Sequence, residues 1–227
     1  VWWSPERILF SGDNFYHAFP NLYAIRGTPY RDFDAWADTM DQLMAYAPDV
    51  LAPGHTSPII GAAQIIESLT GYRDAIRFVV SETVKGMNAG LDPVTVAAGL
   101  KLPPHLAEKP YLQEYYGMIA YASRAYFAGT LGWFDGNPTS LGQLPAAEEA
   151  GRIIALAGGA ANVLAAAQQA VADADHQWAL ADRLIAAGAE VEAAKTLKVN
   201  ALRVLADQTI NAPTRNYYLL SARELEE

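Results

Sequence analysis

Hydrophobic residues are spaced in two different ways along the chain, and the spacing changes once. In the first part, short apolar runs predict strands at Val1–Trp3, Arg7–Gly12 and Val50–Pro53, the first two as an antiparallel pair. Apolar residues then recur at helical spacing over residues 32–47, with an aspartate at the expected start of the helix. The loop over residues 14–29 is long, and long loops in compact domains are often functional.

From residue 62 onward the spacing of apolar residues is helical throughout. A long helix is predicted from Ile65 towards Gly90, and Lys101–Pro110 is predicted as a proline-broken loop. The last third is typical of helical hairpins with small residues on their inner faces, similar to tetratricopeptide-like pairs. The other predicted helices are Pro93–Leu100, Tyr111–Trp133, Pro145–Leu156, Ala160–Ala172, Asp175–Ala187, Val191–Leu205 and Pro213–Leu225.

Composition narrows the classes of function. With 52% hydrophobic and 18% charged residues, the 227-residue chain can bury a core and is not expected to be disordered. The formal net charge of −9 argues against nucleic-acid binding. The absence of cysteine excludes disulfides and thiolate metal sites. The alanine-rich runs are interrupted by polar residues, so no membrane span is expected.

Two side chains that can bind metal follow directly after predicted strands. Asp13 comes after the run that ends at Gly12, and His55 comes after the run that ends with Pro53 and Gly54. A strand end holds a ligand rigidly, and a carboxylate with an imidazole suits zinc. Either residue alone is more often a turn or structural residue. Both residues in this order, with a helix-length segment between them, are less easily explained as unrelated turns.

Several longer motifs carry a resemblance to a known family. They are Trp2–Asp13, Ala18–Gly27, Ala52–Ile59, Tyr72–Ile76, Gly86–Gly90, Leu102–Pro104, Gly132–Pro138 and Arg215–Leu219. Together they resemble the alkylsulfatases, the branch of the metallo-β-lactamase superfamily that removes sulfate from alkyl sulfate detergents. The resemblance runs nearly from end to end of the chain.

The resemblance implies a mostly α fold with two parts. Residues 1–61 would be the carboxy-terminal part of an αββα metallo-β-lactamase-like catalytic domain. Residues 62–227 would be an all-helical alkylsulfatase dimerisation domain with tetratricopeptide-like hairpins. This arrangement implies a homodimer held by the helical part.

The resemblance also assigns roles to individual residues. It implies two zinc ions that activate water. Asp13 would bridge the two ions, and His55 would complete the ligand shell of one of them. Asn21 and Arg26 would hold the sulfate group, and a planar guanidinium suits paired oxyanion oxygens. His17 and Tyr121 are expected near the site, although a structural role is an open alternative for both.

The sequence departs from the family pattern at two of these positions. Relatives usually carry glutamate where Asp13 stands, and many carry histidine where Tyr121 stands. The shorter Asp13 side chain would move the bridging carboxylate by about one methylene, which leaves metal binding at this position open. The replacement at Tyr121 leaves any general acid unassigned.

The set of metal ligands expected from the family is incomplete in this chain. The superfamily's His-x-His-x-Asp-His cluster is absent, because His17, His55, His105 and His176 lie far apart in the sequence. A further glutamate ligand is expected upstream of Val1, which itself falls inside a predicted strand. The chain is therefore expected to be the carboxy-terminal portion of a longer protein and to be inactive without its amino-terminal half.

The expected function is zinc-dependent hydrolysis of alkyl sulfate esters to alcohol and inorganic sulfate by the complete protein. One alternative is another metallo-β-lactamase-fold hydrolase, such as a lactonase or phosphodiesterase. A second is a non-catalytic helical dimerisation module. The sequence does not determine the chain length of the substrate, a preference for primary or secondary sulfate esters, or whether attack falls on sulfur or carbon. It also leaves open whether the chain is a natural fragment, an expressed portion or a cleavage product. The compartment is open as well, and a periplasmic or secreted location is compatible with the family.

Overall fold

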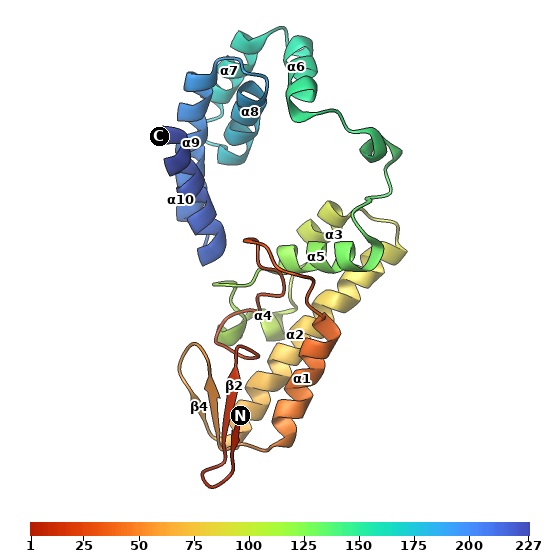
Figure 1. Ribbon diagram of the computed structural model, residues 1–227, viewed down its shortest axis with the longest axis vertical. Helices are drawn as coiled ribbons and strands as arrows, with labels where there is room; N and C mark the ends of the chain where they lie inside the picture. Colours follow the sequence, from red (N-terminus) through yellow and green to blue (C-terminus); the bar gives the residue numbers. More distant parts are fainter. The chain divides into compact units, whose positions relative to one another are not determined.

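Helices make up most of the chain, and one small sheet lies near its beginning (Figure 1). The computed structural model describes residues 1–227 and contains ten α-helices and four strands. Contacts divide the chain into two compact units, Val1–Asn137 and Pro138–Glu227. The predicted mostly α fold is confirmed. The predicted domain boundary between residues 61 and 62 stays a prediction.

The four strands follow one another across the sheet in the order β1, β2, β3, β4. Strand β2 pairs antiparallel with β1, as predicted, and parallel with β3. The short β4, which the hydrophobic pattern did not predict, pairs antiparallel with β3. Because β2 and β3 are parallel, their carboxyl ends meet at the same edge of the sheet. The strands are β1 (Trp2–Trp3), β2 (Ile8–Gly12), β3 (Val50–Pro53) and β4 (Ile59–Ile60).

One face of the sheet packs into the main core of the first unit. Leu9, Leu51 and Ile59 point to this face and are buried. They join a cluster with residues of helices α1 (Phe33–Ala45) and α2 (Ala62–Asn88), which lie side by side in Figure 1. The alternation of strand side chains therefore places every second apolar residue in the core.

The opposite face of the sheet is apolar and exposed. Phe10 and Ile60 are 49% and 75% exposed, and Trp3 on the edge strand is 53% exposed. The register aligns Trp3 and Ile60 with the same row of the sheet, so these side chains share one face. Large exposed apolar patches of this kind mark interaction surfaces.

Helices α1 and α2 are joined by ion pairs as well as by apolar packing. The Asp32 side chain caps α1 by accepting a hydrogen bond from the Ala35 N–H. On α2, the Arg73 guanidinium lies 2.6 Å from the Asp41 carboxylate of α1. Arg77 also contacts Asp41, at 3.0 Å. Helix α1 ends at Ala45, slightly earlier than predicted.

The predicted helix Tyr111–Trp133 is wrong in its first third. Helix α5 begins only at Ile119, because the Glu114 side chain accepts the Ile119 N–H at 2.6 Å and Gly117 packs closely against Pro20. The predicted loop before it contains a short helix, α4. The elements here are α3 (Pro93–Gly99), α4 (Pro104–Ala107), η1 (Pro110–Leu112) and α5 (Ile119–Leu131).

The second unit consists of the helices predicted for the last third, with small differences at their ends. Successive helices from α7 to α10 pack against each other, and small side chains such as Ala181 and Ala194 are fully buried between them. No single helix is long and apolar enough to cross a membrane; α6 and α7 reach that length only as a pair bent by 86°. The elements are η2 (Pro138–Gly142), α6 (Ala146–Leu156), α7 (Ala160–Gln169), α8 (Ala174–Ala186), α9 (Val191–Gln208) and α10 (Ala212–Glu226).

Candidate functional site

Asp13 and His55, the two predicted metal ligands, lie next to each other in the structure. The Nε2 atom of His55 is 3.5 Å from the Oδ1 atom of Asp13. Asp13 follows β2 and His55 follows β3, and the parallel pairing of these strands brings both residues to one edge of the sheet. The two side chains therefore lie together, and their role as metal ligands stays a prediction.

Glycine on each strand end makes this approach possible. The Gly54 N–H donates to the Gly12 carbonyl at 2.9 Å, which fastens the two strand ends together. A Cβ atom at Gly54 would lie 2.7 Å from Asp13 Oδ1 and 3.3 Å from the Gly12 carbonyl carbon. Gly12 has φ of +57°, which favours glycine. A larger residue at Gly54 would therefore displace the Asp13 carboxylate.

The donor chemistry of the pair fits zinc, but the chain supplies only part of a site. Carboxylate oxygen and imidazole nitrogen are both zinc donors, and the Asp13 and His55 side chains are 70% and 75% exposed. No group of three or more histidine, aspartate or glutamate side chains lies close enough together to hold a metal ion. A catalytic zinc site takes about three protein ligands, so Asp13 and His55 alone would make only part of one.

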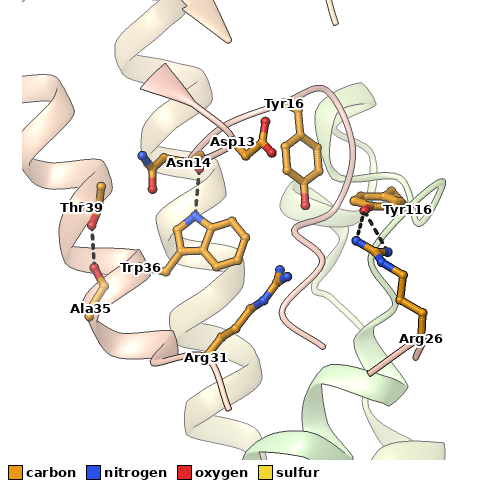
Figure 2. A pocket seen from close by; sticks show the side chains of 9 residues that line it. All are labelled: Asp13, Asn14, Tyr16, Arg26, Arg31, Ala35, Trp36, Thr39 and Tyr116. Atoms are coloured by element: carbon orange, nitrogen blue, oxygen red, sulfur yellow. Dashed lines mark hydrogen bonds between the residues drawn. The ribbon is translucent and has the colours of Figure 1, made fainter. Parts of the chain in front are cut away.

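A cavity of about 550 Å³ opens beside Asp13 (Figure 2). Its wall combines one carboxylate, two guanidinium groups, two phenols and an indole. Figure 2 shows the guanidinium groups of Arg26 and Arg31, which belong to the same loop before α1, pointing into it. The lining residues are Asp13, Asn14, Tyr16, Arg26, Arg31, Ala35, Trp36, Thr39 and Tyr116.

Arg26, predicted to hold sulfate, reaches this cavity and contacts Tyr116. Both terminal nitrogens of its guanidinium donate to the Tyr116 hydroxyl at 3.3 Å. Burial by itself would raise the pKa of Tyr116, but the hydrogen bond and charge of Arg26 lower it, and the net pKa falls below the ordinary value. The Arg26 guanidinium contacts this hydroxyl and forms no salt bridge.

Asn21, the other predicted sulfate-binding residue, is buried and does not line this cavity. Its backbone is held from both sides. The Asn21 N–H donates to the Tyr16 hydroxyl at 2.6 Å, and Arg31 donates to the Asn21 carbonyl at 2.5 Å. Burial raises the pKa of Tyr16 to about 12, so this phenol stays protonated at neutral pH. The direct role predicted for Asn21 stays a prediction.

His17 and Tyr121 line two other cavities. The His17 N–H donates to the Thr56 hydroxyl at 3.2 Å, one residue beyond His55, and burial lowers the pKa of the His17 imidazole. Its ring shares a cavity of about 340 Å³ with Glu67. Tyr121 lines a mostly apolar cavity of about 410 Å³ on α5. Their near-site roles stay predictions.

Sequence reasoning missed Arg31, Tyr16, Tyr116 and Trp36. Arg31 had a local signal, because it lies in the same loop as Arg26 and directly before the helix start. Tyr116 had none, since it reaches Arg26 across 90 residues of sequence. Trp36 is one of the apolar residues at helical spacing over residues 32–47, and its indole N–H donates to the Asn14 carbonyl at the cavity wall.

Comparison with known families matches most of the helical part of the chain. Residues 92–227 match the family model described as alkyl sulfatase dimerisation. The match includes α3 to α10 and therefore the whole second unit.

Individual relatives extend the similarity to the sheet. The chain is 42% identical over 210 residues to a linear primary-alkylsulfatase of Pseudomonas sp., covering 91% of this chain and 40% of that protein. It is 31% identical to the alkyl/aryl-sulfatase BDS1 of Saccharomyces cerevisiae, covering 100% of this chain and 36% of the relative. The solved structure of the stereoselective inverting sec-alkylsulfatase Pisa1 from Pseudomonas sp. superposes with a TM-score of 0.95 at 34% identity, covering 100% of this chain and 37% of Pisa1. The chain thus spans about two fifths or less of these proteins.

Proposed function

The chain belongs to the alkyl sulfatase dimerisation family, and from this premise we propose that it forms the carboxy-terminal portion of a sulfuric ester hydrolase. The complete protein would cleave alkyl sulfates to alcohol and inorganic sulfate. The helical part would mediate formation of a homodimer. The names of the relatives support this choice of reaction, since two of those described above are alkylsulfatases and the yeast protein is an alkyl/aryl-sulfatase.

The observation that carries the proposal is the meeting of Asp13 and His55 at 3.5 Å beside a cavity lined by arginine. A metal-binding pair and a positively charged pocket are the two parts that hydrolysis of an anionic ester needs. In a chain with a net charge of −9, an anionic substrate requires such a local positive site.

Asp13 and His55 would hold zinc, which when bound polarises the ester and lowers the pKa of water to ~7. The remaining donors would come from the amino-terminal part of the complete protein. Arg26 would bind the sulfate oxygens through the guanidinium nitrogens that now contact Tyr116. The Tyr116 hydroxyl would keep this guanidinium oriented when no substrate is present.

The exposed face of the sheet supports an additional domain. Phe10, Ile60 and Trp3 present an apolar row that no element of this chain covers. In two-layered folds an apolar sheet face is buried against a second layer. A further part of the complete protein would supply this layer, since this chain spans only 40% and 37% of the relatives' length.

Dimer formation through the helical part is supported by the family match and by exposed apolar side chains. Leu156, Val171 and Leu220 in the second unit are 89%, 72% and 52% exposed. Obligate interfaces are apolar and resemble a core cut in half.

The test uses the proposed complete protein, of which this chain would be one part. We expect it to release inorganic sulfate from dodecyl sulfate and to leave a lactone panel and phosphodiesters uncleaved. Asp13→Ala and His55→Ala should each lower sulfate release by more than ~100-fold, since metal affinity depends on each ligand. Arg152→Gln, at an exposed arginine in the second unit, serves as the control and should leave the rate unchanged. Lactone or phosphodiester cleavage without sulfate release would overturn the proposal in favour of another hydrolase.

A further inference from the structure

Arg31 is a second arginine of the cavity beside Asp13. Its guanidinium points into the cavity in Figure 2 and lies 6.0 Å from the centre of the Trp36 ring, on the first turns of α1. One of its terminal nitrogens donates to the Asn21 carbonyl at 2.5 Å. The side chain is therefore fixed in direction by an aromatic face and a backbone carbonyl, and its other N–H groups remain available.

The cavity arginines are unusual in having no carboxylate partner. In this acidic chain every lysine and arginine forms a salt bridge except Arg26, Arg31, Lys101 and Arg124. Two of these free cations face the same cavity. Both are held by neutral oxygens, the Tyr116 hydroxyl and the Asn21 carbonyl.

We propose that Arg31 is a second anion-binding residue that, together with Arg26, holds the sulfate group in this cavity. The inference rests on the proposed function and adds a binding residue to it. Two guanidinium groups that line one cavity can each offer paired N–H donors to different oxygens of one tetrahedral anion. Two positive charges also favour the dianionic product sulfate over the monoanionic ester, so Arg31 would contribute most to binding the released sulfate.

The test titrates the purified chain with sodium sulfate and, separately, with sodium methyl sulfate at constant ionic strength, by calorimetry. Arg31→Gln should weaken sulfate binding by roughly 10-fold or more, the worth of one charge-assisted contact, and methyl sulfate binding by less. Arg31→Lys keeps the charge and should recover most of the sulfate affinity. Arg152→Gln removes the same charge from the second unit and should change neither affinity.

A merely structural role predicts a different pattern. If Arg31 only positions Asn21, Arg31→Gln would weaken both anions equally and Arg31→Lys would not recover binding, and the inference would be overturned. Unchanged binding in Arg31→Gln combined with loss in Arg26→Gln would also overturn it, while the proposed function would stand. No sulfate binding by the unmodified chain would contradict the anion-binding role of both arginines. Thermal unfolding followed by circular dichroism confirms that each variant is folded.

Discussion

At the scale of single residues, hydrogen bonds to the backbone fix the loop that carries Asn21 and Arg26. The Tyr16 hydroxyl accepts the Asn21 N–H, and Arg31 donates to the Asn21 carbonyl. Both partners of Asn21 also line the cavity. The loop is therefore anchored by the same side chains that form the cavity wall, so a change in either should affect loop order and anion binding together.

Removal of the Tyr16 hydroxyl tests this anchoring. Tyr16→Phe leaves the buried Asn21 N–H without its partner, which costs about 1–3 kcal/mol. We expect faster amide hydrogen exchange at Asn21 and a lower free energy of unfolding by that amount in denaturant titrations. Tyr46→Phe is the control, since Tyr46 is 48% exposed. Unchanged exchange at Asn21 would contradict an anchoring role for Tyr16.

The sequence was sufficient to place some of these residues but not others. Asp13 and His55 could be predicted because each directly follows an apolar run, and strand ends of a parallel pair meet at one edge. The contact of Arg26 with Tyr116 could not be predicted, because the two residues are 90 positions apart and no local sequence pattern links them. The burial of Asn21 was not predicted either, because a polar residue in a loop is ordinarily expected to be exposed.

At the scale of elements, the segment before α5 is shaped by its contact with the site loop. The Phe19 N–H donates to the Gln113 carbonyl, and the Gly117 N–H donates to the Phe19 carbonyl. This pairing explains why the helix predicted from Tyr111 begins only at Ile119. Of the tyrosines before Ile119, Tyr111 is buried, whereas Tyr115 and Tyr116 are 51% and 37% exposed, so helical spacing here predicted neither the backbone nor the burial.

Substitution of Gly117 tests that close approach. A Cβ at this position would lie 2.1 Å from the Pro20 carbonyl oxygen, so Gly117→Ala forces the two segments apart. We expect a loss of about 1–3 kcal/mol in the free energy of unfolding, typical of overpacking. Gly99→Ala is the matched control, because a Cβ there meets no atom within 4 Å. Equal stability of the two variants would refute the close packing.

The ion pairs between α1 and α2 predict a dependence of stability on pH. Hydrogen bonds from Arg73 lower the pKa of Asp41 below its ordinary value of 3.8. A carboxyl whose pKa is lowered by folding stabilises the folded state above its ordinary pKa, and this contribution is lost as the pH falls through the folded value. Urea titrations from about pH 5 to pH 3 should therefore show a smaller loss of stability in Asp41→Asn than in the unmodified chain.

Asp38→Asn is the control for this series. Asp38→Asn also removes one negative charge from α1, but Arg77, the ion-pair partner of Asp38, still contacts Asp41. The acid-dependent loss of stability should therefore stay close to that of the unmodified chain. An Asp41→Asn variant with the full acid-dependent loss would contradict a stabilising role for the Arg73–Asp41 pair.

At the scale of the whole molecule, the family match and the exposed apolar side chains predict self-association. Light scattering over a dilution series should give a mass twice the 24.5 kDa of one chain. The helical spacing of apolar residues predicted the helices α6 to α10 to within a few residues of their ends. A monomer at every concentration would show that the helical part does not dimerise without the rest of the protein.

The central claim is that Asp13 and His55 converge on zinc, and histidine NMR of this chain tests it most directly. During titration with Zn²⁺, the ring resonances of His55 should respond before those of His17, His105 and His176. Asp13→Asn should weaken this selective response, since it removes the neighbouring carboxylate charge. An equal response of all the histidines, or a His55 response that is unaffected by Asp13→Asn, would contradict a shared metal site.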